Sequence, residues 1–244
     1  MSHPNSFAAR KARFLNRVYA RLSARAVAAT VFTSSPEPRT IGSFARGRQL
    51  VAGNYLFAGY LIEAPDASLW QLTVPDAAYA SEMHGFAWMD DLAAVGDTKT
   101  RYKAQAWLWD WIDRYGNGSG AGWTPDLTGR RLIRWVNHAL FLLSGQNAQA
   151  SEAFYHSLAH QTKFLAKRWH SASPGLPRFE ALTGLIHAGL SLEGKEAVAA
   201  PAIKALAREC KTQIDAQGGL PTRNPEELLQ VFMLLTWAAA VLAD

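Results

Sequence analysis

The segment WTPDLTGRRLIRWVNHALFLLSG, Trp123 to Gly145, decides the fold class because it predicts a long helix with two chemically different faces. Thr124 is a suitable N-cap, Pro125 fits the first helical position, and Asp126 is favourable near the positive end of the helix dipole. At about 100° per residue, one arc is apolar and must face a core. This arc contains Leu132, Trp135, Val136, Ala139, Leu140 and Leu143.

The opposite arc of the same helix is basic and holds no carboxylate. It contains Arg130, Arg131, Arg134, Asn137 and His138. A solvated helix face usually mixes charges of both signs, so this pattern favours a surface that meets anions. A plain solvated basic face is the competing interpretation, and the two stay open.

The composition indicates an ordered protein with an anionic partner. The chain has 244 residues, of which 49% are hydrophobic and 18% are charged, and its net charge is +5. These values exclude a disordered chain and favour a polyanionic glycan, nucleic acid or membrane headgroups as partner. No nucleic-acid-binding module is recognisable, so we expect no specific nucleic acid. Cys210 is the single cysteine, which excludes an intrachain disulfide and a cysteine-based zinc site.

The N-terminal stretch ARKARFLNRVYARLSAR, Ala9 to Arg25, predicts a basic amphipathic helix. It has no apolar run of signal-peptide length, which predicts a cytoplasmic chain. No segment has the roughly twenty apolar residues of a membrane span, so we expect no transmembrane segment. Peripheral membrane contact by this first helix is a secondary interpretation.

Breaks in the predicted secondary structure along the chain predict two domains. Residues 1–74 hold the basic helix, a break at TSSPEPRTIGS, and one or two strands in GRQLVAGNYLFAGYLIEA that form a short hairpin ending near Trp70 to Val74. Residues 75–244 read as a chain of antiparallel helical hairpins because the joints are short. The predicted helices are 76–94, 98–115, 125–144, 150–170, 177–192, 196–216 and 225–242. Their odd number predicts that the architecture continues beyond Asp244.

Two helices hold further candidate binding residues. HGFAWMDDL places His84, Trp88 and Asp91 on one helical face, where a carboxylate can orient the histidine and the indole can stack on a sugar. His156 and His160 have metal-ligand spacing, but no third ligand follows, so no metal is predicted. For both groups a structural role is the open alternative.

Loops supply a third group of candidates. Arg178, Arg223 and Asn224 lie at helix starts, and guanidinium groups bind carboxylates or sulfates as a fork. Bonds to the carbonyls of neighbouring turns are the alternative for both arginines. No P-loop, GxGxxG, GxSxG or HExxH motif occurs, and no cofactor is predicted.

Four motifs in order resemble the N-terminal helical domain of bacterial heparinase II/III family proteins. They are WTPDLTGRRLIRWVNHALFLL, SLAHQTKFLAKRW, GLPRFEALTGLIHAGLSLEG and QIDAQGGLPTRNPEELLQV, and HGFAWMDDL and NYLFAGYLIEA resemble a divergent branch. The resemblance implies a mainly α fold, an incomplete (α/α) toroid of antiparallel helical hairpins with a short N-terminal β-hairpin, followed in family members by a C-terminal β-sandwich. It also implies a polysaccharide lyase in the periplasm that cleaves acidic, uronate-containing glycans such as glycosaminoglycans by β-elimination.

The chain departs from the family where catalysis occurs. Active members carry an Asn-His pair and a further Asn before the equivalent of LIHAG, where this chain has GLPRFEALTG without asparagine. The family's tyrosine turn is replaced by Asn224, Pro225, Glu226 and Glu227. The resemblance therefore implies a glycan-binding domain without matched catalytic residues, inactive alone; the alternative is a non-catalytic helical scaffold that binds a protein partner or an anionic surface. The expected substrate wall is His84, Trp88, Trp123, Arg130, Arg134, His138, His156, His160, Arg178, Arg223 and Asn224.

Overall fold

Helices build almost the whole fold, and the arrangement is the predicted mainly α, incomplete toroid. The computed structural model describes residues 7–29, 31–34, 38 and 40–243. The α-helices are α1 (Phe7–Ser23), α2 (Phe44–Val51), α3 (Ala77–Gly85), α4 (Trp88–Val95), α5 (Thr98–Tyr115), α6 (Pro125–Asn137), α7 (Ala139–Leu143), α8 (Ala148–Arg168), α9 (Leu176–Ser191), α10 (Ala199–Gln213) and α11 (Pro225–Ala243). Short 3-10 turns cover Leu69–Gln71, Trp169–Ser171 and Glu196–Val198. Asp244 and part of the predicted break at 33–43 lie outside the described residues.

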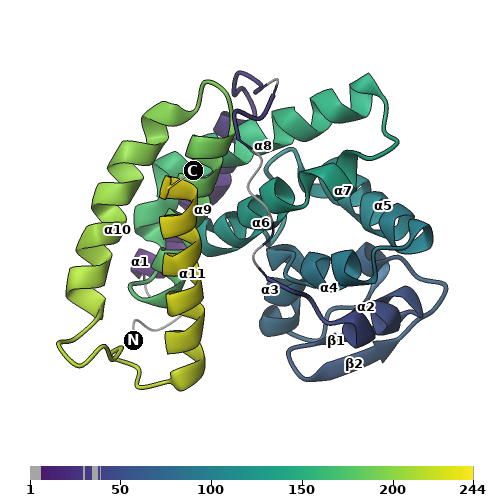
Figure 1. Cartoon of the computed structure of the whole chain (residues 1–244), viewed down its shortest axis with the longest axis horizontal. Coiled ribbons are helices and arrows are strands. Elements are labelled where there is room, and N and C mark those ends of the chain that lie inside the picture. The colour runs from purple at the N-terminus through teal and green to yellow at the C-terminus, as the bar shows by residue number, and fades with distance from the viewer. Residues whose placement is uncertain (1–6, 30, 35–37, 39, 244) are drawn as a thin grey trace.

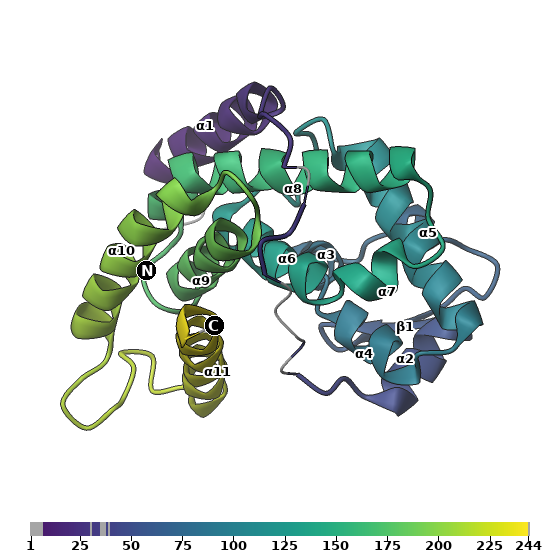
Figure 2. The same ribbon diagram turned by 45° about the horizontal axis from the view of Figure 1, so that its top comes forward.

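The helices form an open arc (Figure 1). Turned forward, the view shows α10 and α11 at one end and α2, α4 and the strands at the other, with α6 and α9 between them (Figure 2). Helix α6, which carries the basic and apolar faces described above, packs against α9, α8 and α3 and so holds the two ends of the arc together.

Two glycines let α6 and α9 approach each other closely. A Cβ at Gly184 would lie 2.4 Å from the Cα of Gly129, and a Cβ at Gly129 would lie 2.2 Å from the carbonyl oxygen of Glu180. Both distances are too short for real contacts, so any larger residue would push the helices apart. This approach also brings the next residue of α6, Arg130, beside Glu180 of α9.

The predicted hairpin exists, but it is shorter than expected. Strand β1 (Asn54–Phe57) pairs antiparallel with β2 (Tyr60–Glu63) in the register Asn54↔Glu63. Ala58 and Gly59 have φ of 50° and 83°, as a two-residue hairpin loop requires. The predicted end near Trp70 to Val74 is therefore wrong.

The segment before this hairpin is helical, although strands were expected to begin there. Ser43 caps α2 by accepting a hydrogen bond from the amide of Arg46, and Gly47 fits closely against the backbone of Asp91 in α4. Packing against α4 outweighs the strand preference of residues such as Val51.

Two predicted helices are each divided in two. Phe86 has φ of 60° and separates α3 from α4, while His138 has φ of −103° and ψ of 17° and separates α6 from α7. Both side chains are buried, so tertiary packing selects a backbone that local propensity does not.

The first 74 residues contact two different parts of the arc. Helix α1 packs on α8, whereas α2 packs on α4 and β1. The proposed division at residue 74 stays a prediction.

Contrary to the expectation from the sequence, one of the described helices, α11, is long and apolar enough to cross a membrane by length and composition alone. It packs on α9 through Val231, Leu234, Trp237, Ala238 and Val241.

Candidate binding surfaces

Carboxylates from neighbouring helices pair with the basic face of α6. Arg130 Nε lies 2.6 Å from Glu180 Oε1 of α9, and Arg134 Nε lies 3.4 Å from Asp90 Oδ2 of α4. His138 Nε2 lies 2.7 Å from the other oxygen of Asp90. The helix has no carboxylate on this face because its partners come from elsewhere in the chain. The predicted solvated or anion-binding face is thus largely an internal ion-pair network.

Arg131 is fully buried and belongs to the core. Its Nε donates to Gln161 Oε1 at 2.7 Å, and its Nη1 donates to the carbonyl oxygens of His84 and Gly122 at 3.0 and 3.1 Å. Its guanidinium lies 4.2 Å from the ring centre of Trp111. Burial lowers the pKa of Arg131 to about 9, so it remains a cation at neutral pH. Carbonyls and an aromatic ring stabilise this charge.

The expected group of His84, Trp88 and Asp91 does not form. His84 Nδ1 accepts a hydrogen bond from Trp111 Nε1 at 3.1 Å, and burial lowers the pKa of His84 to about 3. Asp91 instead accepts from the amide of Ser43 at 2.7 Å. The prediction was wrong because the break at Phe86 removes His84 from the helix that carries the other two residues.

Neither of the two tryptophans that were expected to contact a glycan, Trp88 and Trp123, is accessible to a ligand. Trp88 is 2% exposed and donates from Nε1 to the carbonyl of Met83. Trp123 is 3% exposed and contacts the His160 ring, with ring centres 4.4 Å apart and the planes tilted by 32°. Both rings therefore fill the core.

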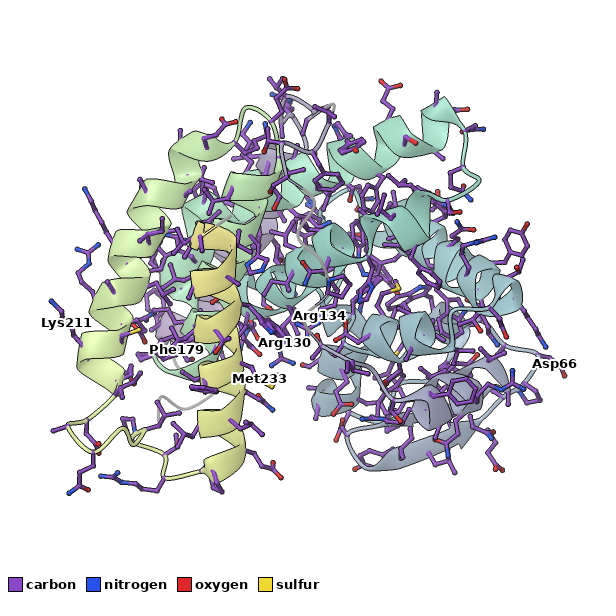
Figure 3. All side chains as sticks on the ribbon, viewed as in Figure 1. Asp66, Arg130, Arg134, Phe179, Lys211 and Met233 are labelled. Atoms are coloured by element: carbon purple, nitrogen blue, oxygen red, sulfur yellow. The ribbon has the colours of Figure 1, made fainter. Side chains whose placement is uncertain are left out.

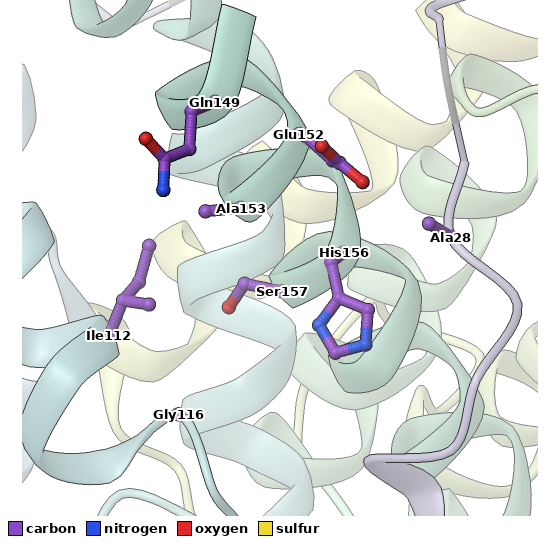
Figure 4. Close-up of a pocket in the computed structure, with 8 residues that line it drawn as sticks. All are labelled: Ala28, Ile112, Gly116, Gln149, Glu152, Ala153, His156 and Ser157. Carbon is purple, nitrogen blue, oxygen red and sulfur yellow. The ribbon is translucent and has the colours of Figure 1, made fainter.

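The two histidines of α8 face different environments. His160 is buried, its Nε2 lies 2.6 Å from the carbonyl oxygen of Ala20, and burial lowers its pKa to about 4. His156 is exposed and lines a separate cavity of about 430 Å³ with Glu152 (Figure 4). No group of three His, Cys, Asp or Glu side chains among the described residues is arranged to hold a metal.

The loop candidates make local contacts. Arg178 contacts Glu209 Oε2 at 3.2 Å and donates to the carbonyl of Ala172 at 2.8 Å. Arg223 pairs with Asp215 at 2.8 Å, and Asn224 Oδ1 accepts from the amide of Glu226. The bond of Arg178 to the Ala172 carbonyl is of the kind that the structural alternative predicts, whereas Arg223 pairs with a carboxylate instead of a carbonyl.

A cleft lies between α3 and α4 on one side and α9 and α11 on the other. It consists of cavities of about 520 and 190 Å³ that share Ala87, Arg130 and Gln230 in their linings. Figure 3 shows Arg130, Arg134 and Met233 in this region. Its charged lining residues are Arg46, Arg130, Arg134, Glu82, Asp90, Asp91 and Glu180. Four carboxylates thus face three guanidinium groups, and the cleft is not the basic groove that the sequence predicts.

Helix α1 presents three of its large apolar side chains outward, while Leu15, Val18 and Tyr19 are half-buried. Phe7, Phe14 and Leu22 are 83%, 64% and 54% exposed, while the smaller Asn16 and Ala20 are buried. Helix α1 lies on the outside of the arc, alongside α8 (Figure 2). Its exposed surface also carries Arg10, Lys11, Arg13, Arg17 and Arg21, and residues 7–23 include no acidic residue. The sequence predicted this helix but not which face it buries.

Comparisons with known proteins agree on the fold. The chain superimposes on a heparinase III (TM-score 0.59, 16% identity, 98% of this chain and 44% of that one) and on heparan sulfate lyase from Pedobacter heparinus (TM-score 0.61, 17% identity, 98% and 46%). At such low identity the likeness shows the fold alone. The chain therefore has the helical-domain fold seen in heparinases, as the sequence resemblance implied.

A sequence relative adds a second connection. The chain is 30% identical over 208 residues to FtsZ-localized protein C of Caulobacter vibrioides, which covers 82% of this chain and 34% of the relative. The chain thus spans about a third of that relative's length. No protein-family model matches the chain.

Proposed function

We propose that this chain is a non-catalytic helical module that attaches to an anionic membrane surface through α1. The observation that carries the proposal is the orientation of this helix, with Phe7, Phe14 and Leu22 turned to solvent among basic residues. A helix core contact normally buries large apolar side chains, as α1 does in part with Tyr19, whereas Phe7, Phe14 and Leu22 are left outside. Interfacial helices combine apolar side chains and Lys or Arg in this way.

The free energies of apolar burial and charge attraction are large enough for reversible attachment of α1 to a membrane. Complete burial of a Phe or Leu side chain contributes roughly 1.5–3 kcal/mol. Each Lys or Arg near an anionic leaflet adds about 1 kcal/mol. Since α1 is already folded on α8 through Asn16 and Ala20, attachment does not require the helix to form anew.

Several features support a role without catalysis. The segment that resembles the lyases' catalytic region carries Glu180 and no asparagine, and Arg130 already pairs with that carboxylate. The motif with the lyases' tyrosine has Glu226 and Glu227 instead. Uronate elimination would need groups from another part of a longer protein, such as a C-terminal β-sandwich.

The Caulobacter relative suggests where such a module would work. Its name states that it localises with FtsZ, and we propose that this chain serves a protein of the same kind, on the cytoplasmic face of the membrane. The cytoplasmic leaflet is anionic, which suits the five basic residues of α1.

Vesicle co-sedimentation tests the proposal. The protein should pellet with phosphatidylglycerol-containing vesicles and stay in solution with phosphatidylcholine vesicles, and added salt should weaken the binding. Phe14→Ser should reduce binding about tenfold, corresponding to the loss of one buried aromatic ring. Leu140→Ser is the matched control, because Leu140 is 81% exposed on α7, away from α1. Equal binding by wild type and the Phe14 variant would overturn the proposal.

Acidic-glycan binding is the second candidate. The heparinase-like fold favours it, and Arg130 and Arg134 are the cations of the cleft that an acidic glycan would have to take from Glu180 and Asp90. Binding to heparin should then be lost in Arg134→Gln and retained in Arg17→Gln, whereas general ion exchange would weaken in both.

A further inference from the structure

Strand β2 forms an uncovered edge of the hairpin. In the part of the chain that the structure describes, the sheet has two strands, β1 and β2. Strand β1 packs on α2 and α3, whereas β2 packs chiefly on β1. Figure 1 shows β2 at the lower margin of the molecule. Its outer edge is therefore open to a further strand.

The hydrogen bonds of the hairpin identify the backbone groups on this edge. The amide of Ala64 donates to the carbonyl of Gly53 at 2.9 Å, so these two residues form a hydrogen-bonded pair. Hydrogen-bonded and non-hydrogen-bonded pairs alternate along an antiparallel ladder, so every second residue of β2 points its amide and carbonyl at β1. Leu61 and Glu63 lie between those residues and point theirs outward. They present two donors and two acceptors to an incoming strand.

The side chains of β2 leave apolar surface beside this edge. On the outer face of the hairpin, Leu61 is 56% exposed and its cross-strand partner Leu56 is 41% exposed. On the inner face, Tyr60 is 48% exposed although its partner Phe57 is buried. A third strand would extend both faces and pack beside Leu61 and Tyr60. Edge strands that avoid such pairing usually carry Lys, Pro or a bulge, and β2 carries none of these.

The hairpin lies in a segment whose charged residues are all acidic. From Gln49 to Thr98 the sequence has no lysine or arginine, and its carboxylates are Glu63, Asp66, Asp76, Glu82, Asp90, Asp91 and Asp97. Glu63 and Asp66 are exposed at the end of β2, and Figure 3 shows Asp66 at the outer margin of the molecule.

Cations of the adjoining helices are engaged elsewhere. Arg46 and Arg48 of α2 pair with Asp91 and Asp97. Lys103 of α5 donates to the carbonyl of Val51 at 2.9 Å. Among the described residues, Glu63 and Asp66 belong to no ion pair. Their charge favours a basic partner, whereas pairing β2 with β2 of a second copy would bring two acidic surfaces together.

We propose that the outer edge of β2 binds an extended basic segment of a partner protein as a third strand. Main-chain hydrogen bonds to Leu61 and Glu63 set the register. Apolar side chains of the segment pack beside Leu61 and Tyr60, and its Lys or Arg side chains meet Glu63 and Asp66. Because the contact is short and partly electrostatic, binding is reversible and weakens as salt is added.

This interaction goes beyond attachment through α1 and does not depend on it. Helix α1 packs on α8, and Figure 2 shows α1 and β1 on different sides of the arc. The basic helix and the acidic hairpin can therefore engage a membrane and a protein partner at the same time.

Amide exchange with water, measured by NMR on the whole chain, tests the proposal. The probe is a short capped peptide of alternating valine and lysine, added to roughly 1 mM so that binding with a Kd near that value is detected. The amides of Leu61 and Glu63 should exchange about tenfold more slowly at roughly 90% saturation, because exchange then occurs from the unbound fraction. The amide of Ile62, which already faces β1, should slow much less. Unchanged exchange at Leu61 and Glu63 would overturn the proposal.

Two matched peptides separate strand addition from other binding. A peptide of alternating valine and glutamate should have no effect, because its charge is wrong. A peptide of alternating proline and lysine keeps the positive charge but cannot form a strand, and it should also have no effect on these amides. Slowing by either peptide equal to that by the valine-lysine peptide would contradict the proposal. Slowing that increases with protein concentration, without any peptide, would replace the partner by a second copy.

Variants locate the site. Leu61→Pro removes an outward amide that makes no bond to β1, so the amide of Glu63 should no longer respond to the peptide, whereas Leu61→Ala keeps the amide and the response. Replacing both Glu63→Gln and Asp66→Asn should weaken binding about threefold or more at low salt, and Glu152→Gln on α8 is the matched control. Equal binding by Leu61→Pro and wild type would contradict the proposal. Vesicle binding should be unchanged in all these variants, which separates this result from the function of α1.

Discussion

At the scale of single residues, buried histidines make the fold sensitive to acid. Burial lowers the pKa of His84 to about 3 and that of His160 to about 4, from an ordinary value of 6.5. Below pH 6.5 these two histidines are protonated in the unfolded chain but stay neutral in the folded chain. The free energy of unfolding therefore decreases as the pH falls toward 4. Urea unfolding should show a lower midpoint at pH 5 than at pH 7. Imidazole NMR titration should leave both rings neutral at pH 5, and a protonated ring at that pH would contradict the assignment.

The contribution of Glu180 to stability has the opposite dependence on pH. Burial raises its pKa to about 7 although Arg130 works against the rise. Between pH 4.5 and about 7, Glu180 is protonated in the folded chain but ionised in the unfolded chain. This carboxyl therefore lowers the free energy of unfolding as the pH rises through that range. Glu180→Gln should remove that pH dependence, so the variant should lose less stability than wild type between pH 5 and pH 8, whatever the constant cost of leaving Arg130 without its partner. Paired urea titrations measure the difference; Glu152→Gln, at an exposed carboxylate, should show none.

At the scale of elements, the crossing of α6 and α9 depends on glycine. Gly129→Ala improves helix propensity by about 0.5–1 kcal/mol, but its Cβ would overlap the backbone of Glu180. We expect a net loss of roughly 2–4 kcal/mol because overpacking against backbone cannot be relieved by a rotamer change. Thermal unfolding should show a clearly lower midpoint. Lys204→Ala on the exposed side of α10 is the control, and equal midpoints would mean that the helices separate at little cost.

The observed helices also show how much of the fold can be predicted from the sequence. Apolar periodicity and capping residues predicted the helices from α5 to α11 because each buries one face against a neighbour. The breaks at Phe86 and His138 and the helix α2 were missed, since tertiary contacts decide them. The site was predicted least well: Arg130, Arg134 and His138 do lie together, but Glu180 and Asp90, which neutralise them, are 50 and 48 residues away from Arg130 and His138 along the chain. Spacing within one helix cannot reveal such partners.

At the scale of the whole molecule, a heparinase-like fold is combined with an interior that opposes the heparinase reaction. β-Elimination requires a cation free to neutralise a uronate carboxylate and groups that move a proton. Here Arg130 is engaged by Glu180, Arg134 lies beside Asp90, and His84 and His160 are buried bases of very low pKa. A uronate entering the cleft would have to displace an internal carboxylate from its partner.

We therefore expect no lyase activity from this chain. Incubation with heparin, heparan sulfate or alginate should give no increase in the ultraviolet absorbance of unsaturated uronate products, while an active heparinase tested in parallel should. Glu180→Asn restores an asparagine to the segment that resembles the lyases' catalytic region and frees Arg130; even this variant should stay inactive, because no tyrosine stands in the TRNPEE turn. Product formation by wild type would contradict the non-catalytic proposal and favour the acidic-glycan candidate. Product formation by the variant alone would mean that the pairing of Glu180 with Arg130 is what silences a competent cleft.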